Sequence, residues 1–186
     1  MQTNYKLSGT PNSPVLIFSN SLGTTMSMWD NVVPFLLPYF QVLQYDTRGH
    51  GNSSITPDPY TIELLGQDVI DLMNKLNIEE AHFCGLSMGG LIGKWLAIHH
   101  PKRIKKLVLS NTAAKIGDAE TWNQRIVTIK TNGMQSIVDA TMQRWFTDGF
   151  IASSKQKIEE QKLSFSNNNA VGYTNACAAV RDADFR

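Results

Sequence analysis

The chain has 186 residues, 42% of them hydrophobic and 18% charged, and its formal net charge at pH 7 is +1. This composition is typical of a globular domain with a sizeable core, and it argues against nucleic acid and membrane surfaces as partners. We therefore expect a small-molecule partner. No apolar signal segment and no run of membrane-spanning length occurs, so we expect a cytoplasmic protein in which Cys84 and Cys177 are free thiols.

Short apolar runs alternate with helical patterns along the first part of the chain. The runs that predict strands are residues 14–20, 41–47, 82–87 and 105–112. Near-continuous apolar runs are typical of strands buried on both faces, and the intervals between them are long enough for crossover helices. Residues 60–78 predict a surface helix, with Asp68 and Asp71 off its packed face. The pattern indicates an α/β fold with a mostly parallel sheet.

The alternation stops after residue 112. Residues 113–180 show helical patterns interrupted by polar turns, which predicts a helical cap inserted over the core formed by residues 1–112. Residues 181–186 are expected to begin the return to the core, so that the final strands of the sheet are missing. The polar N-terminal segment reaches the first long run early, and an initial edge strand is expected to be missing or short.

A serine between glycines is the main chemical signal. Residues 85–89 read Gly-Leu-Ser-Met-Gly, a G-x-S-x-G motif that follows a predicted strand and precedes a predicted helix. In that context the turn is sharp and presents Ser87 as a nucleophile, while the Met88 N–H at the helix start can hold an oxyanion. The alternative is a turn that uses its glycines only for packing.

A second oxyanion donor is expected from the loop after the first long strand. By its position in residues 19–29, the donor would be the backbone N–H of Leu22. The alternative is a turn in which Asn20, Ser21 and Gly23 bend the chain without touching substrate.

Several segments together resemble the 3-oxoadipate enol-lactonases of the α/β-hydrolase superfamily. They read NSLGTTMSMWD, VLQYDTRGHGNSS, PYTIELLGQDV, AHFCGLSMGG, LVLSNTAAKIG and RWFT. The resemblance implies hydrolysis of an unsaturated five-membered lactone bearing an acetate arm, in bacterial catabolism of aromatic compounds through the 3-oxoadipate pathway. It implies no metal and no organic cofactor. It also implies that the triad acid and histidine follow the serine on later strands, so the chain is expected to be truncated at its C-terminus.

The acetate arm of such a lactone needs hydrogen-bond donors in the cap. Trp122 and Arg125 are the candidates, because an indole N–H and a guanidinium both suit a carboxylate. Trp145 is a candidate pocket wall. The alternative for all three is a cap helix with an aromatic stripe and a solvated arginine.

No histidine within the chain is expected to act as the base. His82 lies about 16 Å from Ser87 along the same strand. His99 lies about 18 Å away along the following helix, and His100 is next to it. His50, in the Arg-Gly-His-Gly segment, is more simply explained as part of a turn. We therefore expect the nucleophile half of an active site, without its acid and base and inactive alone.

Other interpretations remain open. Asp46 is expected to brace its loop, and Asp182 lies in the tail. An esterase or a C–C bond hydrolase would share the serine and differ in the cap, whereas a dehalogenase would need a carboxylate in place of Ser87. The chain could instead be a non-catalytic binding module or fragment. If residues 105–112 form the last strand, their exposed apolar edge predicts self-association.

Overall fold

The computed structural model describes residues 2–186 and contains a five-stranded sheet with the order β1-β3-β2-β4-β5. Its strands are β1 (Tyr5–Ser8), β2 (Val15–Ser19), β3 (Gln41–Tyr45), β4 (Ala81–Leu86) and β5 (Ile104–Ser110). All neighbours pair in parallel except β1, which runs antiparallel to β3. The four predicted strands and the mostly parallel sheet are confirmed. The initial edge strand, expected to be missing or short, is present with four residues.

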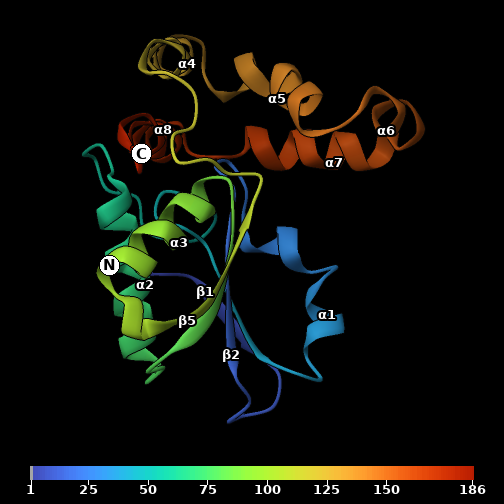
Figure 1. Ribbon diagram of the computed structural model, residues 1–186. Helices are drawn as coiled ribbons and strands as arrows, with labels where there is room; N and C mark the ends of the chain where they lie inside the picture. The colour runs from blue at the N-terminus through green and yellow to red at the C-terminus, as the bar shows by residue number, and fades with distance from the viewer. Residues whose placement is uncertain (1) are drawn as a thin grey trace.

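Helices lie on both faces of this sheet and over one end of it (Figure 1). The core contains η1 (Met26–Trp29), α1 (Val33–Leu36), α2 (Ile62–Lys75), α3 (Met88–His99) and η2 (Pro101–Arg103). The cap contains α4 (Ala119–Asn132), η3 (Met134–Ile137), α5 (Val138–Trp145), α6 (Asp148–Ser153), α7 (Lys155–Ser166) and α8 (Ala170–Asp182). The cap covers the carboxyl ends of the parallel strands, where ligands bind in open α/β sheets. None of the helices in residues 2–186 is long and apolar enough to cross a bilayer.

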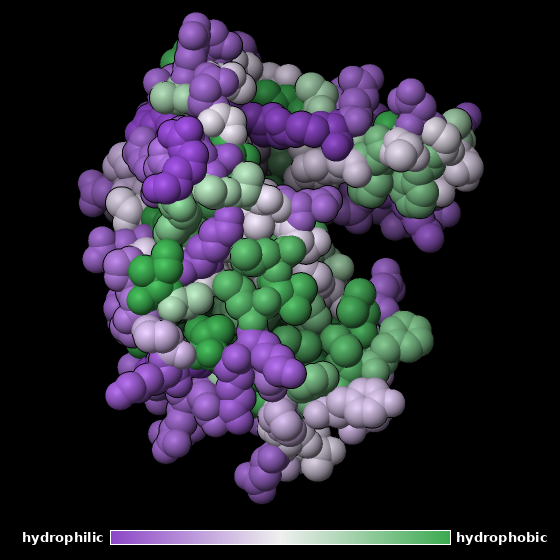
Figure 2. Space-filling view, viewed as in Figure 1, coloured by the Kyte–Doolittle hydropathy of each residue, from purple (hydrophilic) through white to green (hydrophobic). Residues whose placement is uncertain are grey.

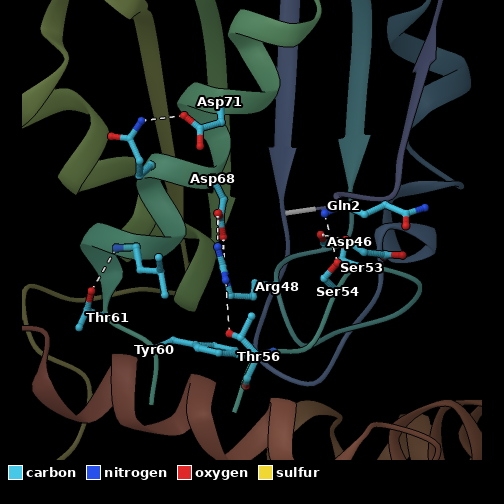
Figure 3. A network of polar contacts seen from close by, with 12 residues as sticks. Gln2, Asp46, Arg48, Ser53, Ser54, Thr56, Tyr60, Thr61, Asp68 and Asp71 are labelled. Atoms are coloured by element: carbon cyan, nitrogen blue, oxygen red, sulfur yellow. Dashed lines mark hydrogen bonds and ion pairs between the residues drawn. The ribbon is translucent and has the colours of Figure 1, made fainter. Parts of the chain in front are cut away.

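The helix α2 packs its apolar face into the main core, as its periodicity predicts. It begins after Thr61, whose hydroxyl oxygen accepts a hydrogen bond from the Leu64 N–H. One part of the prediction is wrong, because Asp68 is buried rather than turned to solvent. Its carboxylate accepts two hydrogen bonds from Arg48, at 2.8 Å from Nε and 2.6 Å from Nη2 (Figure 3). The loop after β3 is thereby tied to α2.

The outer edge of the sheet is apolar and open. Strand β5 is last in the strand order, so its far side pairs with no strand of the described residues. Val108 and Leu109 on this strand are 55% and 42% exposed. Figure 2 shows apolar side chains gathered over the β5 region and toward α1. A surface of this kind can pair with another chain.

Candidate active site

The serine of the G-x-S-x-G motif lies at the turn between β4 and α3. Ser87 has φ 55° and ψ −112°, a backbone conformation that a residue other than glycine rarely adopts. Two hydrogen bonds join it to the end of β5 and the segment that follows: the Ser87 N–H donates to the Ser110 carbonyl at 2.9 Å, and the Thr112 hydroxyl donates to the Ser87 carbonyl at 2.9 Å. The strained turn is therefore fixed by the neighbouring strand.

The two glycines of the motif are required by close backbone contacts. A Cβ atom on Gly85 would overlap the backbone of Gly89, and a Cβ atom on Gly89 would overlap the backbone of Ser19. The Gly89 N–H donates to the Asn20 carbonyl at 3.0 Å. The turn that carries Ser87 is thus joined directly to the loop after β2.

Two backbone amides near this junction have no hydrogen-bond acceptor within residues 2–186. They belong to Leu22, in the loop after β2, and to Met88, the first residue of α3. Both residues are buried, with 7% and 0% exposure. Buried N–H groups without a partner are rare, and the N-terminus of α3 favours negative charge. The arrangement can accept an oxyanion beside Ser87.

The loop that carries Leu22 is braced from several sides. The Asn20 side chain donates to the Tyr45 carbonyl at 2.8 Å and accepts from the Trp29 indole at 2.8 Å. The Ser21 carbonyl accepts from the Thr24 N–H at 3.2 Å and from its hydroxyl at 2.8 Å. Asn20 and Ser21 therefore shape the turn, which is compatible with either interpretation of this loop.

In the cap, the structure gives the three candidate residues different surroundings. The Trp122 indole donates to the Ile116 carbonyl at 2.7 Å, so its single N–H is not free for a carboxylate. Arg125 donates to the Tyr173 hydroxyl at 2.6 Å. Trp145 packs edge to face against Phe165, with ring centroids 5.4 Å apart.

The structure adds Arg144, which precedes Trp145 at the end of α5 and which the sequence did not single out. Partial desolvation and the positive charge of Arg125 lower the pKa of Arg144. Within residues 2–186, neither Arg125 nor Arg144 forms an ion pair with a carboxylate. Two guanidiniums close enough to affect one another, without an acidic partner, can hold an anion. Sequence spacing could not reveal this, because the two arginines lie on different helices.

None of the four histidines hydrogen-bonds to Ser87. The His50 Nε2 accepts from the Gly23 N–H at 2.9 Å, and its Nδ1 lies 3.2 Å from the Arg48 carbonyl. Because Nε2 accepts from the Gly23 N–H, the ring carries its proton on Nδ1, and burial lowers the pKa of His50. The His82 ring lies edge-on to Phe40. The rings of His99 and His100 pack beside Trp95.

Asp46 and Asp182, for which the sequence predicts no catalytic role, are bonded to groups other than a histidine. Asp46 accepts from the Asn4 side chain at 2.7 Å and from the N–H groups of Met26 and Asn52 at 2.8 and 3.0 Å, which confirms that it braces its loop. Asp182 pairs with its neighbour Arg181 at 2.7 Å. Neither carboxylate serves a histidine.

The cysteines are isolated thiols. Cys84 lies on β4 and Cys177 is buried in α8, and neither forms a disulfide. Burial raises the pKa of Cys177 to about 12, so its thiol stays protonated at neutral pH. In the part of the chain that the structure describes, no three His, Cys, Asp or Glu side chains gather in a way that could hold a metal.

A parallel sheet under a helical cap, with a strained serine between a strand and a helix, defines a class of hydrolases. The chain belongs to the alpha/beta hydrolase fold family, whose model matches residues 14–182. It is 45% identical to 3-oxoadipate enol-lactonase 2 of Acinetobacter baylyi over 98% of this chain and 68% of that protein. These similarities assign the chain to the ester hydrolases of this fold.

Two solved structures are similar to this chain in fold. The enol-lactonase from Burkholderia xenovorans LB400 is 44% identical, with a TM-score of 0.96 over 98% of this chain and 71% of that chain. A thermophilic esterase from Thermogutta terrifontis is 22% identical with a TM-score of 0.90, over 98% of this chain and 68% of that chain, a similarity that concerns the fold alone.

Proposed function

We propose that this chain carries the nucleophile and oxyanion hole of a 3-oxoadipate enol-lactonase. The observation that carries the proposal is the strained Ser87 beside the unpaired amides of Leu22 and Met88. Hydrolases of this fold use such a serine with one amide from the following residue and one from the loop after an earlier strand. The lactone is suggested by the two enol-lactonase relatives, at 45% and 44% identity.

The reaction would proceed through an acyl-enzyme. The Ser87 oxygen forms a bond to the ring carbonyl carbon while a base takes the hydroxyl proton, and the two amides hold the oxyanion. The ring C–O bond then breaks and releases an enolate, which is protonated to the ketone. The proton that the base took from Ser87 goes to the enolate. In the second half, the base takes a proton from water, the water oxygen bonds to the acyl carbon, and the base passes that proton to the Ser87 oxygen as the ester bond breaks and the acid is released. The enolate is a good leaving group, and ketone formation favours ring opening.

The base and the acid that orients it are proposed to come from outside the described residues. The His50 ring is engaged at both nitrogens, and the other histidines pack against Phe40 or Trp95. The Acinetobacter baylyi relative has a further third of its length beyond the 68% that this chain matches. We propose that the corresponding region supplies both groups, and that the 186 residues alone are catalytically weak.

The carboxylate of the substrate is proposed to bind Arg125 and Arg144. Trp122, whose N–H is engaged by the Ile116 carbonyl, then forms a wall of the pocket, as does Trp145. The two guanidiniums have no acidic partner in the described chain, so an incoming carboxylate would displace no acidic side chain. A substrate with an acetate arm fits this site better than a neutral ester does.

Binding of 3-oxoadipate to the purified chain tests this assignment. Arg125→Gln and Arg144→Gln should each weaken binding about tenfold or more, because each removes charge-assisted hydrogen bonds. The measurement is isothermal titration calorimetry, with a neutral dimethyl ester as the comparison ligand. Lys130→Gln, an exposed change on α4, is the matched control and should leave the affinity unchanged. Equal affinities in all three variants would overturn the carboxylate assignment.

The cytoplasm is the proposed location, since free thiols such as Cys84 and Cys177 persist there. The proposed partner is the small lactone, without nucleic acid or membrane and without a cofactor.

We also propose that the isolated chain self-associates through β5. Its outer edge has unpaired backbone groups, and Val108 presents a 55% exposed side chain beside them. Val108→Lys should shift the molecule toward monomer, because a lysine on an edge strand opposes pairing. Light scattering over a concentration series measures the change, with Val127→Lys on α4, 62% exposed, as the control. A wild-type chain that stays monomeric at high concentration would contradict the proposal.

A further inference from the structure

Gly23, which follows the proposed oxyanion donor Leu22, is held from two sides. Its N–H donates to the His50 Nε2 at 2.9 Å, and its carbonyl accepts from the Asn168 side chain at 2.9 Å. His50 belongs to the loop after β3, whereas Asn168 lies between α7 and α8 of the cap. Three separate segments of the chain therefore meet at one residue, and we call these hydrogen bonds of Gly23, His50 and Asn168 the Gly23 clamp.

The clamp acts on a tight turn. The Thr24 N–H donates to the Ser21 carbonyl at 3.2 Å, and Gly23 has φ 81°, which matches the third position of a type II turn. The Ser21 carbonyl and the Leu22 N–H belong to the same peptide group. Because that peptide is planar, the turn that fixes the carbonyl also fixes the direction of the Leu22 N–H.

The cap packs closely on this turn. A Cβ atom on Gly23 would lie 2.9 Å from the Tyr173 ring and would also overlap Phe165, so no larger residue fits beneath the cap. The helix α8, which carries Tyr173, also contacts the loop that carries His50, because Gly172 lies against the backbone of Gly49. The cap thus supplies one hydrogen bond of Gly23 and packs against both the turn that carries Gly23 and the loop that carries His50.

We propose that His50 and Asn168 are positioning residues that hold the oxyanion hole, and that the cap is required to aim the Leu22 N–H. This inference rests on the proposed role of Leu22. His50 acts as a neutral hydrogen-bond acceptor, with its Nδ1–H toward the Arg48 carbonyl. Asn168 contributes as a donor, and its amide also bonds to the Phe165 carbonyl at 2.8 Å.

Amide hydrogen exchange tests the clamp directly in the ¹⁵N-labelled 186-residue chain. His50→Leu removes the acceptor, and Asn168→Asp replaces the donor by a group that repels the Gly23 carbonyl. Both should speed exchange of the Gly23 N–H and shift the Leu22 amide resonance. His50→Gln offers an oxygen in place of Nε2 and should restore most of the wild-type behaviour. His99→Leu, at an exposed site on α3, is the matched control.

The function of the clamp is tested with phenylboronic acid, which forms a tetrahedral adduct with a serine hydroxyl and mimics the oxyanion. His50→Leu and Asn168→Asp should weaken its binding about ten- to a hundredfold, since a misplaced donor loses much of its effect. Binding is compared at a temperature at which circular dichroism shows each variant folded. His50→Gln should bind nearly as well as the wild type.

The outcomes separate this inference from the proposed function. If Ser87→Ala binds the boronic acid as well as the wild type, the proposed role of Ser87 is overturned. If neither protein binds it, the missing base accounts for the result. In both cases the clamp is tested by the amide exchange measurements alone. If binding depends on Ser87 but His50→Leu, Asn168→Asp and His99→Leu are all equivalent to the wild type, the clamp is overturned. Unchanged Leu22 and Gly23 amides in His50→Leu would overturn it as well.

Discussion

The 186-residue chain is expected to hydrolyse the enol-lactone about a millionfold more slowly than a chimera that supplies the missing base. The chimera joins these residues to the part of the Acinetobacter baylyi enol-lactonase that lies outside the match. A serine hydroxyl without a base is a weak nucleophile at neutral pH, whereas the oxyanion hole and binding alone retain about 10³ to 10⁴ over water. Single-turnover assays on both proteins measure the difference.

Ser87→Ala in the chimera is the matched control for this prediction. It should reduce the rate about as much as removing the base does, because the two groups act as a unit. Parallel assays on a simple aryl ester separate a lactonase from a general esterase. If the isolated chain works within about tenfold of the chimera and Ser87→Ala abolishes that activity, a base within these residues has been overlooked. His50 would then be the first residue to examine.

The sheet and the serine turn could be predicted from sequence because their signals are local. Each buried strand is a short apolar run, and the residues around Ser87 place glycines where backbone must approach backbone. The cap was predictable only as a helical region. Two of its helices, α5 and α6, have only eight and six residues, and α6 and α7 are separated by Ser154 alone, so no sequence pattern separates α6 from α7.

Contacts between distant segments could not be predicted. The bond from Asn168 to the Gly23 carbonyl and that from Arg125 to Tyr173 join residues far apart in the chain. Trp122 has the right chemistry for a carboxylate, but its N–H is engaged by the Ile116 carbonyl. Propensity and periodicity describe which face of a helix is buried, and they do not identify the partner of a polar side chain.

Asp68 illustrates the same limit and has a large expected effect on stability. Helical periodicity placed it off the packed face, yet it is 8% exposed and forms a two-point ion pair with Arg48, which is 11% exposed. The positive charge of Arg48 is accommodated in the interior only because this carboxylate is present. The pair also anchors the loop that carries His50, two residues further along the chain.

Asp68→Ala is therefore expected to lower the free energy of unfolding by about 3 to 5 kcal/mol, because it leaves a largely buried guanidinium without an acidic partner. Asp68→Leu combined with Arg48→Met should recover much of that loss, since the uncompensated charge is removed with its partner. Urea unfolding followed by circular dichroism gives both values.

The control is an ion pair of similar length on the surface. Lys105 and Glu80 lie 2.7 Å apart with 45% and 49% exposure, and Glu80→Ala should cost less than about 1 kcal/mol because water screens the pair. If Asp68→Ala proves no more destabilising than Glu80→Ala, the pair with Arg48 does not support the fold. If Asp68→Ala is destabilising and the double variant remains equally so, the loss arises from packing around α2 rather than from the unpaired charge.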